Sequence, residues 1–253
     1  MRRPIAIVQA RMASSRLPGK VLEDLAGAPL LARIVERLRA ARTLGGIAVA
    51  TTDRPEDKPI RFLAQVMHIG CFVGSDWDVL ARYAGAAEQF EADPVIRILG
   101  DCPLVDPELV DACVAAYRSV PATAYVALGG EFPEGLDTEV VSARALRRAH
   151  LEAALPAERE DVTPFIRRHP ERFPSRLVPF PEPFGRRRWT VDDRRDLEFV
   201  RAVYGRLHRP GEVFGWRAVR DLLLREPELL APDAGGARVS GRSPARDAGK
   251  EVR

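Results

Sequence analysis

The stretch PIAIVQARMASSRLPGK, residues 4–20, joins an apolar run to a polar loop. Residues 4–10 are mostly apolar and include two isoleucines and a valine, which is typical of a strand buried in a sheet. Residues 11–20 combine charged, hydroxyl, proline and glycine residues, so we expect a loop there. Ligands of open α/β sheets bind beyond the carboxyl ends of the strands. This loop is therefore the first place where we expect a binding site.

The same alternation of short apolar runs and amphipathic segments continues along the chain, and it predicts an α/β fold with a mostly parallel sheet flanked by helices. Further strands are expected at residues 47–51, 71–73, 94–99, 123–128, 138–141, 175–180 and 187–191. Helices are expected at residues 29–42, 55–69, 75–90, 107–117, 142–151, 158–168, 193–207 and 216–224. Residues 1–230 then form one domain. Residues 231–253 are rich in Gly, Ala, Ser, Pro and Arg without an apolar period, and are expected to be a disordered tail.

Charge and cysteine content narrow the class of protein. The chain has 39 basic and 36 acidic residues, a formal net charge of +3, and five of the basic and three of the acidic residues lie in the tail. A general nucleic-acid binder needs a basic face, so nucleic acid is not an expected partner. The three cysteines show no paired spacing, which argues against structural zinc and against a disulfide framework. Apolar runs are too short for a membrane span or a signal peptide, and we expect a cytoplasmic protein.

The loop at residues 11–20 has the chemistry of a polyphosphate site. It offers the cations Arg11, Arg16 and Lys20, backbone N–H groups, and the hydroxyls of Ser14 and Ser15, of which Ser15 is expected to contact a nucleotide. It has neither the spacing of a Walker A loop nor the glycines of a dinucleotide fingerprint. A solvated basic loop is the alternative. Lys20 favours the phosphate site, because it is one of three lysines in a chain that otherwise uses arginine, and its ammonium is a compact point charge.

Two aspartates are expected at the carboxyl edge of the sheet. Asp101 follows the strand at residues 94–99, and Asp192 follows the last expected strand. The nearby Asp106 and Asp193 suit helix N-caps, which leaves Asp101 without an obvious structural task. If the two strands share a sheet, Asp101 and Asp192 face one cleft. Two carboxylates and the oxygens of a phosphate make an ordinary Mg²⁺ site.

A DxD motif at Asp76 and Asp78 admits a second interpretation. Metal-dependent glycosyltransferases use such a motif to hold the pyrophosphate of a nucleotide-sugar. Here it falls at the start of a helix for which Ser75 is the expected N-cap, and acidic residues are favoured there by the helix dipole. We therefore prefer a structural role for the motif, with a glycosyltransferase as the alternative.

These motifs together resemble the cytidylyltransferase-like proteins of the spore-coat polysaccharide biosynthesis type, relatives of the acylneuraminate and deoxy-octulosonate cytidylyltransferases. The matching pieces are QARMASSRLPGK, SDWDVLARY, VIRILGDCPLVDP, GLDTEVVS, EREDVTPFIRRHPERF and WTVDDRRDLEFV, in family order over about residues 5–200. The resemblance implies a Rossmann-like fold of the GT-A type, an often dimeric enzyme, and transfer of CMP from CTP to a sugar-like acceptor with Mg²⁺ as cofactor.

The resemblance also implies roles for the matched positions. Ala10, Arg11, Asp78 and Arg97 would lie on the nucleotide side, Arg16 and Lys20 on the triphosphate and the leaving pyrophosphate, Asp101 and Asp192 on Mg²⁺, and Glu139 on the acceptor. There are departures at Leu99, where the family usually has Thr, at Asp161, where it commonly has His, and at residues 193–196, where TPED is more usual. The acceptor stays open among an acidic keto sugar, a sugar phosphate and a phosphonate-like alcohol. A non-catalytic nucleotide-binding protein on the same fold is a further alternative.

Overall fold

The computed structural model describes residues 3–182, 184–185 and 187–229. The strands are β1 (Arg3–Gln9), β2 (Gly46–Thr52), β3 (Gly70–Gly74), β4 (Ala92–Leu99), β5 (Tyr125–Gly129), β6 (Glu139–Val141) and β7 (Ser175–Pro179). The α-helices are α1 (Leu30–Arg39), α2 (Lys58–Val66), α3 (Val79–Gln89), α4 (Pro107–Arg118), α5 (Ala143–Glu152), α6 (Pro156–Glu160), α7 (Pro164–Arg168), α8 (Arg194–Leu207) and α9 (Trp216–Arg225). Three short 3₁₀ helices are η1 (Lys20–Leu22), η2 (Pro55–Asp57) and η3 (Pro227–Leu229).

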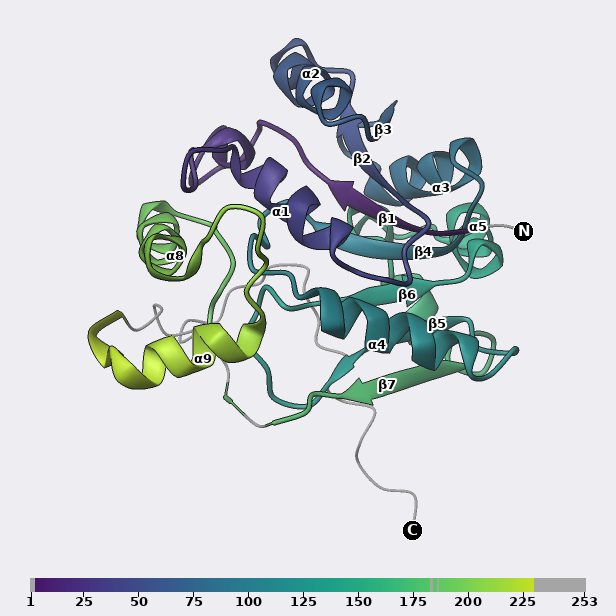
Figure 1. Ribbon diagram of the computed structural model, residues 1–253. Coiled ribbons are helices and arrows are strands. Elements are labelled where there is room, and N and C mark those ends of the chain that lie inside the picture. The colour runs from purple at the N-terminus through teal and green to yellow at the C-terminus, as the bar shows by residue number, and fades with distance from the viewer. Residues whose placement is uncertain (1–2, 183, 186, 230–253) are drawn as a thin grey trace.

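The seven strands form one sheet in the order β3-β2-β1-β4-β6-β5-β7 (Figure 1). Strand β6 runs antiparallel to β4 and β5, and the other neighbouring pairs are parallel. Gln9 at the end of β1 is in register with Ala50 of β2 and Leu99 of β4. The segments that follow these three strands therefore start from one edge of the sheet, where the loop after β1 was expected to bind a ligand.

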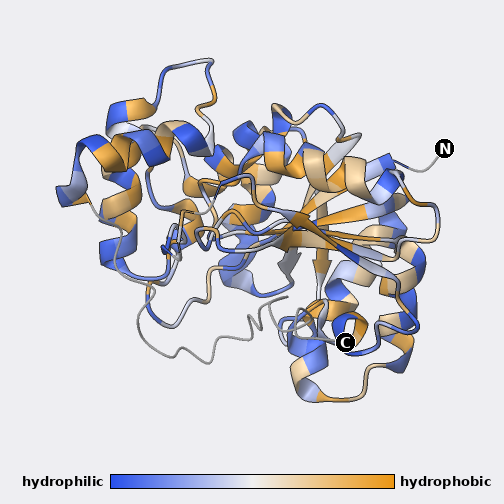
Figure 2. Cartoon of the chain, turned by 90° about the horizontal axis from the view of Figure 1, so that it is seen from below, coloured by the Kyte–Doolittle hydropathy of each residue, from blue (hydrophilic) through white to orange (hydrophobic). Residues whose placement is uncertain are grey.

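Different helices cover the two faces of the sheet. Ala6 and Val8 of β1 lie in a core with residues of α1, α4, α8 and α9, whereas Ile5 and Ile7 lie in a second core with residues of α3, α5 and α7. Side chains alternate between the faces of a strand, so a strand that serves both cores is apolar throughout. Figure 2 shows this arrangement as a layer of hydrophobic strands between helices whose hydrophilic residues face outward.

The predicted α/β class and the mostly parallel sheet are confirmed, and all expected strands except the last have a counterpart in the sheet. The predicted N-caps Asp106 and Asp193 are also confirmed. The side chain of Asp106 accepts from the N–H of Glu108 at 2.9 Å, and that of Asp193 accepts from the N–H of Arg195 at 3.0 Å.

The strand predicted at residues 187–191 is wrong. This segment belongs to no strand that the structure describes, and its backbone instead exchanges two hydrogen bonds of 2.7 Å with Glu134 in the loop before β6. The N–H of Val191 donates to the carbonyl of Asp101 at 2.8 Å, in the loop after β4. Trp189 and Val191 are fully buried in the core that contains α8. The apolar pattern therefore reflects burial in this core and not pairing within the sheet.

Two predicted helix boundaries are also wrong. The helix expected at residues 158–168 is divided into α6 and α7, because Pro164 starts a new first turn, where a missing N–H is tolerated. The N-cap of α3 is Asp78 and not Ser75. The Asp78 side chain accepts from the N–H of Ala81 at 2.8 Å, and Ser75 Oγ accepts from the N–H of Asp78 at 3.1 Å.

Among the described residues, no helix has the length and apolar character needed to cross a membrane. The tail predicted at residues 231–253 lies outside the described residues.

Candidate active site

A cleft of about 620 Å³ opens at the carboxyl edge of the sheet, where β1 and β4 end. It is lined by Gln9, Ala10, Arg11, Ala13, Ser14, Ser15, Lys20, Val21, Arg54, Asp76, Leu99, Gly100 and Asp101. At its floor the N–H of Gly100 donates to the carbonyl of Gln9 at 2.9 Å, and a Cβ on Gly100 would lie 2.4 Å from that oxygen. Glycine at this position therefore allows the two backbones to approach closely. The cleft brings together five predicted site residues, namely Ala10, Arg11, Ser15, Lys20 and Asp101.

A buried aspartate anchors the loop after β1. Asp57 of η2 is 1% exposed, and its carboxylate accepts from the N–H of Met12 at 2.7 Å and from the hydroxyl of Thr52. The loop also closes on itself, since the N–H of Gly19 donates to the carbonyl of Met12 at 2.9 Å. These bonds hold the cations and N–H groups of the loop at the cleft before any ligand arrives.

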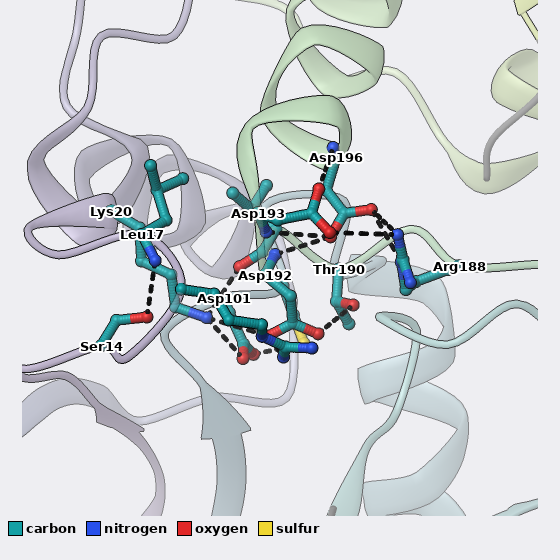
Figure 3. A network of polar contacts seen from close by, with 12 residues as sticks. Ser14, Leu17, Lys20, Asp101, Arg188, Thr190, Asp192, Asp193 and Asp196 are labelled. Atoms are coloured by element: carbon teal, nitrogen blue, oxygen red, sulfur yellow. Dashed lines mark hydrogen bonds and ion pairs between the residues drawn. The ribbon is translucent and has the colours of Figure 1, made fainter. Parts of the chain in front are cut away.

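Lys20 joins the two predicted metal ligands. Its Nζ lies 3.1 Å from Asp101 Oδ2, 3.1 Å from Asp192 Oδ1 and 2.7 Å from the carbonyl oxygen of Val191 (Figure 3). The guanidinium of Arg16 lies 2.9 Å from the same oxygen of Asp192. The four residues proposed for catalysis from the sequence are thus connected, with Lys20 bridging the two aspartates and Arg16 paired with Asp192.

A second aspartate positions the backbone at Asp192. Asp196, at the start of α8, is fully buried, and its Oδ2 accepts from the N–H groups of Asp192 at 2.9 Å and Asp193 at 3.1 Å. Its other oxygen accepts from Nε of Arg188 at 2.7 Å, so the carboxylate is paired with a buried guanidinium (Figure 3). Sequence analysis missed this function of Asp196, although Asp193 and Asp196 have the spacing of a capping box, which is a local signal.

The donor set fits Mg²⁺ only when a ligand contributes to it. Within residues 3–182, 184–185 and 187–229 there is no group of three or more His, Cys, Asp or Glu side chains arranged to hold a metal. Asp101 and Asp192 supply two carboxylates, and oxygen is the donor that Mg²⁺ prefers, commonly with waters and substrate phosphates completing its shell. The two aspartates therefore suit an ion that binds together with a phosphate group.

Sequence analysis did not consider Arg54, and it considered Asp76 only as part of the DxD motif. Asp76 Oδ1 lies 3.0 Å from the Arg11 guanidinium, and Asp76 Oδ2 lies 2.6 Å from that of Arg54. Arg54 follows β2 and Asp76 follows β3, so the argument that placed Asp101 at the carboxyl edge could have found both.

The DxD motif does not present a metal site. Both carboxylate oxygens of Asp76 are paired with arginines, as described above. Asp78 is 6% exposed, caps α3, and accepts from Nε of Arg159 at 3.0 Å. Asp78 also does not belong to the described residues that line the cleft.

Arg97 and Glu139 lie apart from the cleft lining, in a polar network on the face of the sheet that carries α3 and α5. Arg97 forms ion pairs with Glu139 and Asp161. Glu139 also accepts from the hydroxyls of Tyr125 and Thr163, the latter at 2.9 Å. Asp161 thus neutralises Arg97 at a position where the sequence departs from the family. The assignment of Arg97 to the nucleotide and of Glu139 to the acceptor stays a prediction.

Charge pairing keeps this network ionised. Burial alone would raise the pKa of Glu139, but the nearby Arg97 and Arg167 guanidinium groups and the hydrogen bonds that Glu139 accepts bring its pKa below the ordinary value. Burial opposes the charge of Arg97 in the same way, and Asp161 and Glu139 outweigh it, so the pKa of Arg97 is raised. At neutral pH the network is therefore a set of paired charges.

Comparison with known proteins adds independent evidence. The chain is 32% identical over 229 residues to the spore coat polysaccharide biosynthesis protein SpsF of Bacillus subtilis (strain 168), covering 88% of this chain and 94% of the relative. It is 38% identical over 118 residues to a 3-deoxy-manno-octulosonate cytidylyltransferase of Anaeromyxobacter sp. (strain K), covering 46% of this chain and 48% of that protein.

The fold is similar to that of a solved cytidylyltransferase from Leptospira borgpetersenii serovar Hardjo-bovis (strain JB197). The TM-score is 0.86 at 25% sequence identity, with 92% of this chain and 98% of that chain covered. The family model described as cytidylyltransferase matches residues 5–203, which include the loop after β1, Asp101 and Asp192. The chain therefore belongs to the cytidylyltransferase family.

Proposed function

We propose that this protein transfers CMP from CTP to a sugar or sugar-like acceptor, with release of pyrophosphate, and that it requires Mg²⁺. The observation that carries the proposal is the contact of Lys20 and Arg16 with Asp101 and Asp192 beside the cleft. Cations for a triphosphate and carboxylates for a divalent ion are the groups that phosphoryl-group transfer needs in one place.

In this mechanism the acceptor oxygen attacks the α-phosphorus of CTP, a P–O bond forms there, and the bond to pyrophosphate breaks. The loop after β1 would bind the phosphates through its N–H groups, Arg11, Ser15 and Ala10. Lys20 and Arg16 would stabilise negative charge on the leaving pyrophosphate. Asp101 and Asp192 would hold Mg²⁺, which neutralises phosphate charge when bound. Little covalent work remains, so positioning and electrostatics would supply the rate enhancement.

The nucleotide would bind beyond the carboxyl ends of β1 and β2, beside Arg11 and Arg54, which both pair with Asp76. The acceptor side is proposed near Glu139. The similarity to a 3-deoxy-manno-octulosonate cytidylyltransferase supports an acceptor of the sugar class. Because the reaction uses a nucleoside triphosphate, we propose that it occurs in the cytoplasm, and the resemblance to often dimeric enzymes leads us to propose a homodimer.

The glycosyltransferase alternative loses its main support, because the oxygens of Asp76 are occupied by arginines and Asp78 caps α3. A non-catalytic nucleotide-binding protein would keep the cleft but would have no reason to retain Lys20, Arg16, Asp101 and Asp192 in contact.

A thermal-shift panel of CTP, UTP, GTP, ATP and dTTP, each with Mg²⁺, tests nucleotide choice. We expect selective stabilisation by CTP, about 2.7 kcal/mol at a hundredfold excess over Kd. Asp101→Asn should reduce that stabilisation, whereas Asp221→Asn, a control on the exposed side of α9, should keep it.

Pyrophosphate release then tests the reaction with three acceptor classes, namely 3-deoxy keto sugar acids, sugar phosphates and phosphonate-like alcohols. CTP-dependent release with one class supports the transferase. If none of the five triphosphates stabilised the protein, the proposal would be overturned. Stabilisation by CTP without release from any acceptor would favour the non-catalytic alternative.

A further inference from the structure

The ammonium group of Lys20 occupies the position between the two carboxylates. An ammonium has three N–H donors. All three have an acceptor here, namely Asp101 Oδ2 at 3.1 Å, Asp192 Oδ1 at 3.1 Å and the carbonyl oxygen of Val191 at 2.7 Å. The Lys20 side chain is only 12% exposed, and the two carboxylates are 19% and 18% exposed. Lys20 therefore cannot bind a phosphate through Nζ without giving up one of these bonds.

A divalent ion shared by Asp101 and Asp192 would compete with this ammonium. Both are cations drawn to the same pair of carboxylates, and two cations at close range in a partly buried site repel each other strongly. Within the described residues only two carboxylates are available there, so an ion that displaces Lys20 gains few protein ligands. A triphosphate removes both obstacles to metal binding. Its oxygens add ligands for the metal, and its negative charge gives Lys20 another anion to pair with.

We propose that Lys20 is the counter-ion of the metal ligands in the nucleotide-free enzyme. When its ammonium group moves from the two carboxylates to the triphosphate, the carboxylates become available to the metal. This inference rests on the proposed function, because it takes Asp101 and Asp192 as the metal ligands. Metal and triphosphate then bind cooperatively, and the metal alone binds weakly. Lys20 lines the same cleft as Arg11 and Ser15, so a triphosphate bound by the loop lies within its reach.

Lys20 differs from the second cation at this site. The Arg16 guanidinium lies 2.9 Å from Asp192, and its side chain is 40% exposed. Exposed ion pairs are weakened by solvent and contribute little. The carboxylates should therefore depend on Lys20 for neutralisation far more than on Arg16.

The test is the affinity for Mn²⁺ alone, without nucleotide, measured on the full-length protein from the electron paramagnetic resonance signal of free Mn²⁺. Coupling between two ligands is commonly worth about 5- to 150-fold in affinity, so we expect Lys20→Met to bind Mn²⁺ at least about tenfold more tightly than wild type. Arg16→Met should give a smaller gain. Lys58→Met, which removes an exposed lysine at the start of α2, should give none.

The double variant Lys20→Met with Asp101→Asn locates the effect, since it should lose the gained affinity. Equal or weaker Mn²⁺ binding by Lys20→Met would overturn the inference. The proposed function would survive that result if Asp101→Asn still reduced the stabilisation by CTP with Mg²⁺. Tight Mn²⁺ binding that no Asp101 variant changes would overturn the metal assignment itself.

Thermal unfolding with and without Mn²⁺ gives a second measurement. Lys20→Met leaves two carboxylates with less compensation, so Mn²⁺ should raise its unfolding temperature more than that of wild type. If Lys20→Met fails to fold, Lys20→Gln replaces it, because glutamine keeps a polar side chain without the charge. We expect the same larger rise in its unfolding temperature with Mn²⁺.

Discussion

The ion pair between Arg188 and Asp196 is expected to support both the fold and the site, and Asp196→Asn tests this. Asp196 is fully buried and Arg188 is 8% exposed. One carboxylate oxygen accepts from Arg188 at 2.7 Å, and the other accepts from the N–H groups of Asp192 at 2.9 Å and Asp193 at 3.1 Å. An asparagine has a single oxygen. Its NH₂ group must therefore face either the guanidinium or the two backbone N–H groups, and donor then meets donor.

The magnitude follows from this geometry. Removing one partner of a buried ion pair typically destabilises a protein by about 3–5 kcal/mol, because an uncompensated charge is left behind. We expect a loss of about 3 kcal/mol for Asp196→Asn. For a chain of this length that corresponds to a fall of roughly 6–12 °C in the unfolding temperature. The Asp192 backbone also loses its acceptor, so the Mg²⁺ concentration that gives half-maximal stabilisation by CTP should rise by about 10- to 100-fold.

Urea unfolding followed by circular dichroism measures the first effect, and thermal shift with CTP over a Mg²⁺ series measures the second. Asp221→Asn is the matched control, because Asp221 also pairs with an arginine, Arg220 at 2.7 Å, but its side chain is 48% exposed. Exposed pairs contribute about 0.2–1 kcal/mol, so this control should change little. If Asp196→Asn lost no more stability than Asp221→Asn, the pair would not be what holds the turn at Asp192.

Three further variants examine the loop, the cleft floor and the polar network. Asp57→Asn weakens the bond to the N–H of Met12, and we expect CTP affinity by calorimetry to fall about tenfold, as loss of a charged hydrogen bond predicts; unchanged affinity would contradict the anchoring role. Gly100→Ala places a Cβ 2.4 Å from the carbonyl oxygen of Gln9, so denaturant unfolding should show a loss of about 2 kcal/mol, and a neutral effect would show that the close approach relaxes freely. Glu139→Gln should lower stability at pH 7 by about 3 kcal/mol. The pKa of Glu139 lies below its ordinary value of 4.5, so this stabilisation is present above pH 4.5 and is lost as the pH falls through the folded-state pKa. If the difference in unfolding free energy between wild type and Glu139→Gln did not change with pH, the charge assignment would be refuted.

Local patterns were enough where the interacting groups are neighbours in the chain. The N-caps Asp106 and Asp193 were predicted because a capping side chain bonds backbone N–H groups two or three residues ahead. The loop after β1 was predicted because it directly follows a buried strand. Asp101 was predicted because it follows β4, and Arg54 follows β2 in the same way.

An apolar pattern led to a wrong prediction where the residues are buried outside the sheet. The apolar residues Trp189 and Val191 predicted a strand, yet they are buried in the core that contains α8, and the N–H of Val191 donates to the carbonyl of Asp101. Asp101 and Asp192 do meet, as expected, but through that hydrogen bond and Lys20 and not through a shared sheet.

The sequence by itself determined the α/β class, the edge of the sheet where the candidate cleft lies and the residue types proposed to bind phosphate and metal, because periodicity and strand ends are local properties. Only the tertiary structure decided which charges neutralise one another. Lys20 reaches carboxylates 81 and 172 positions away, and Asp76 is shared by two arginines from different loops. Ion pairing depends on distance and burial in space, and neither can be read from positions so far apart in the chain.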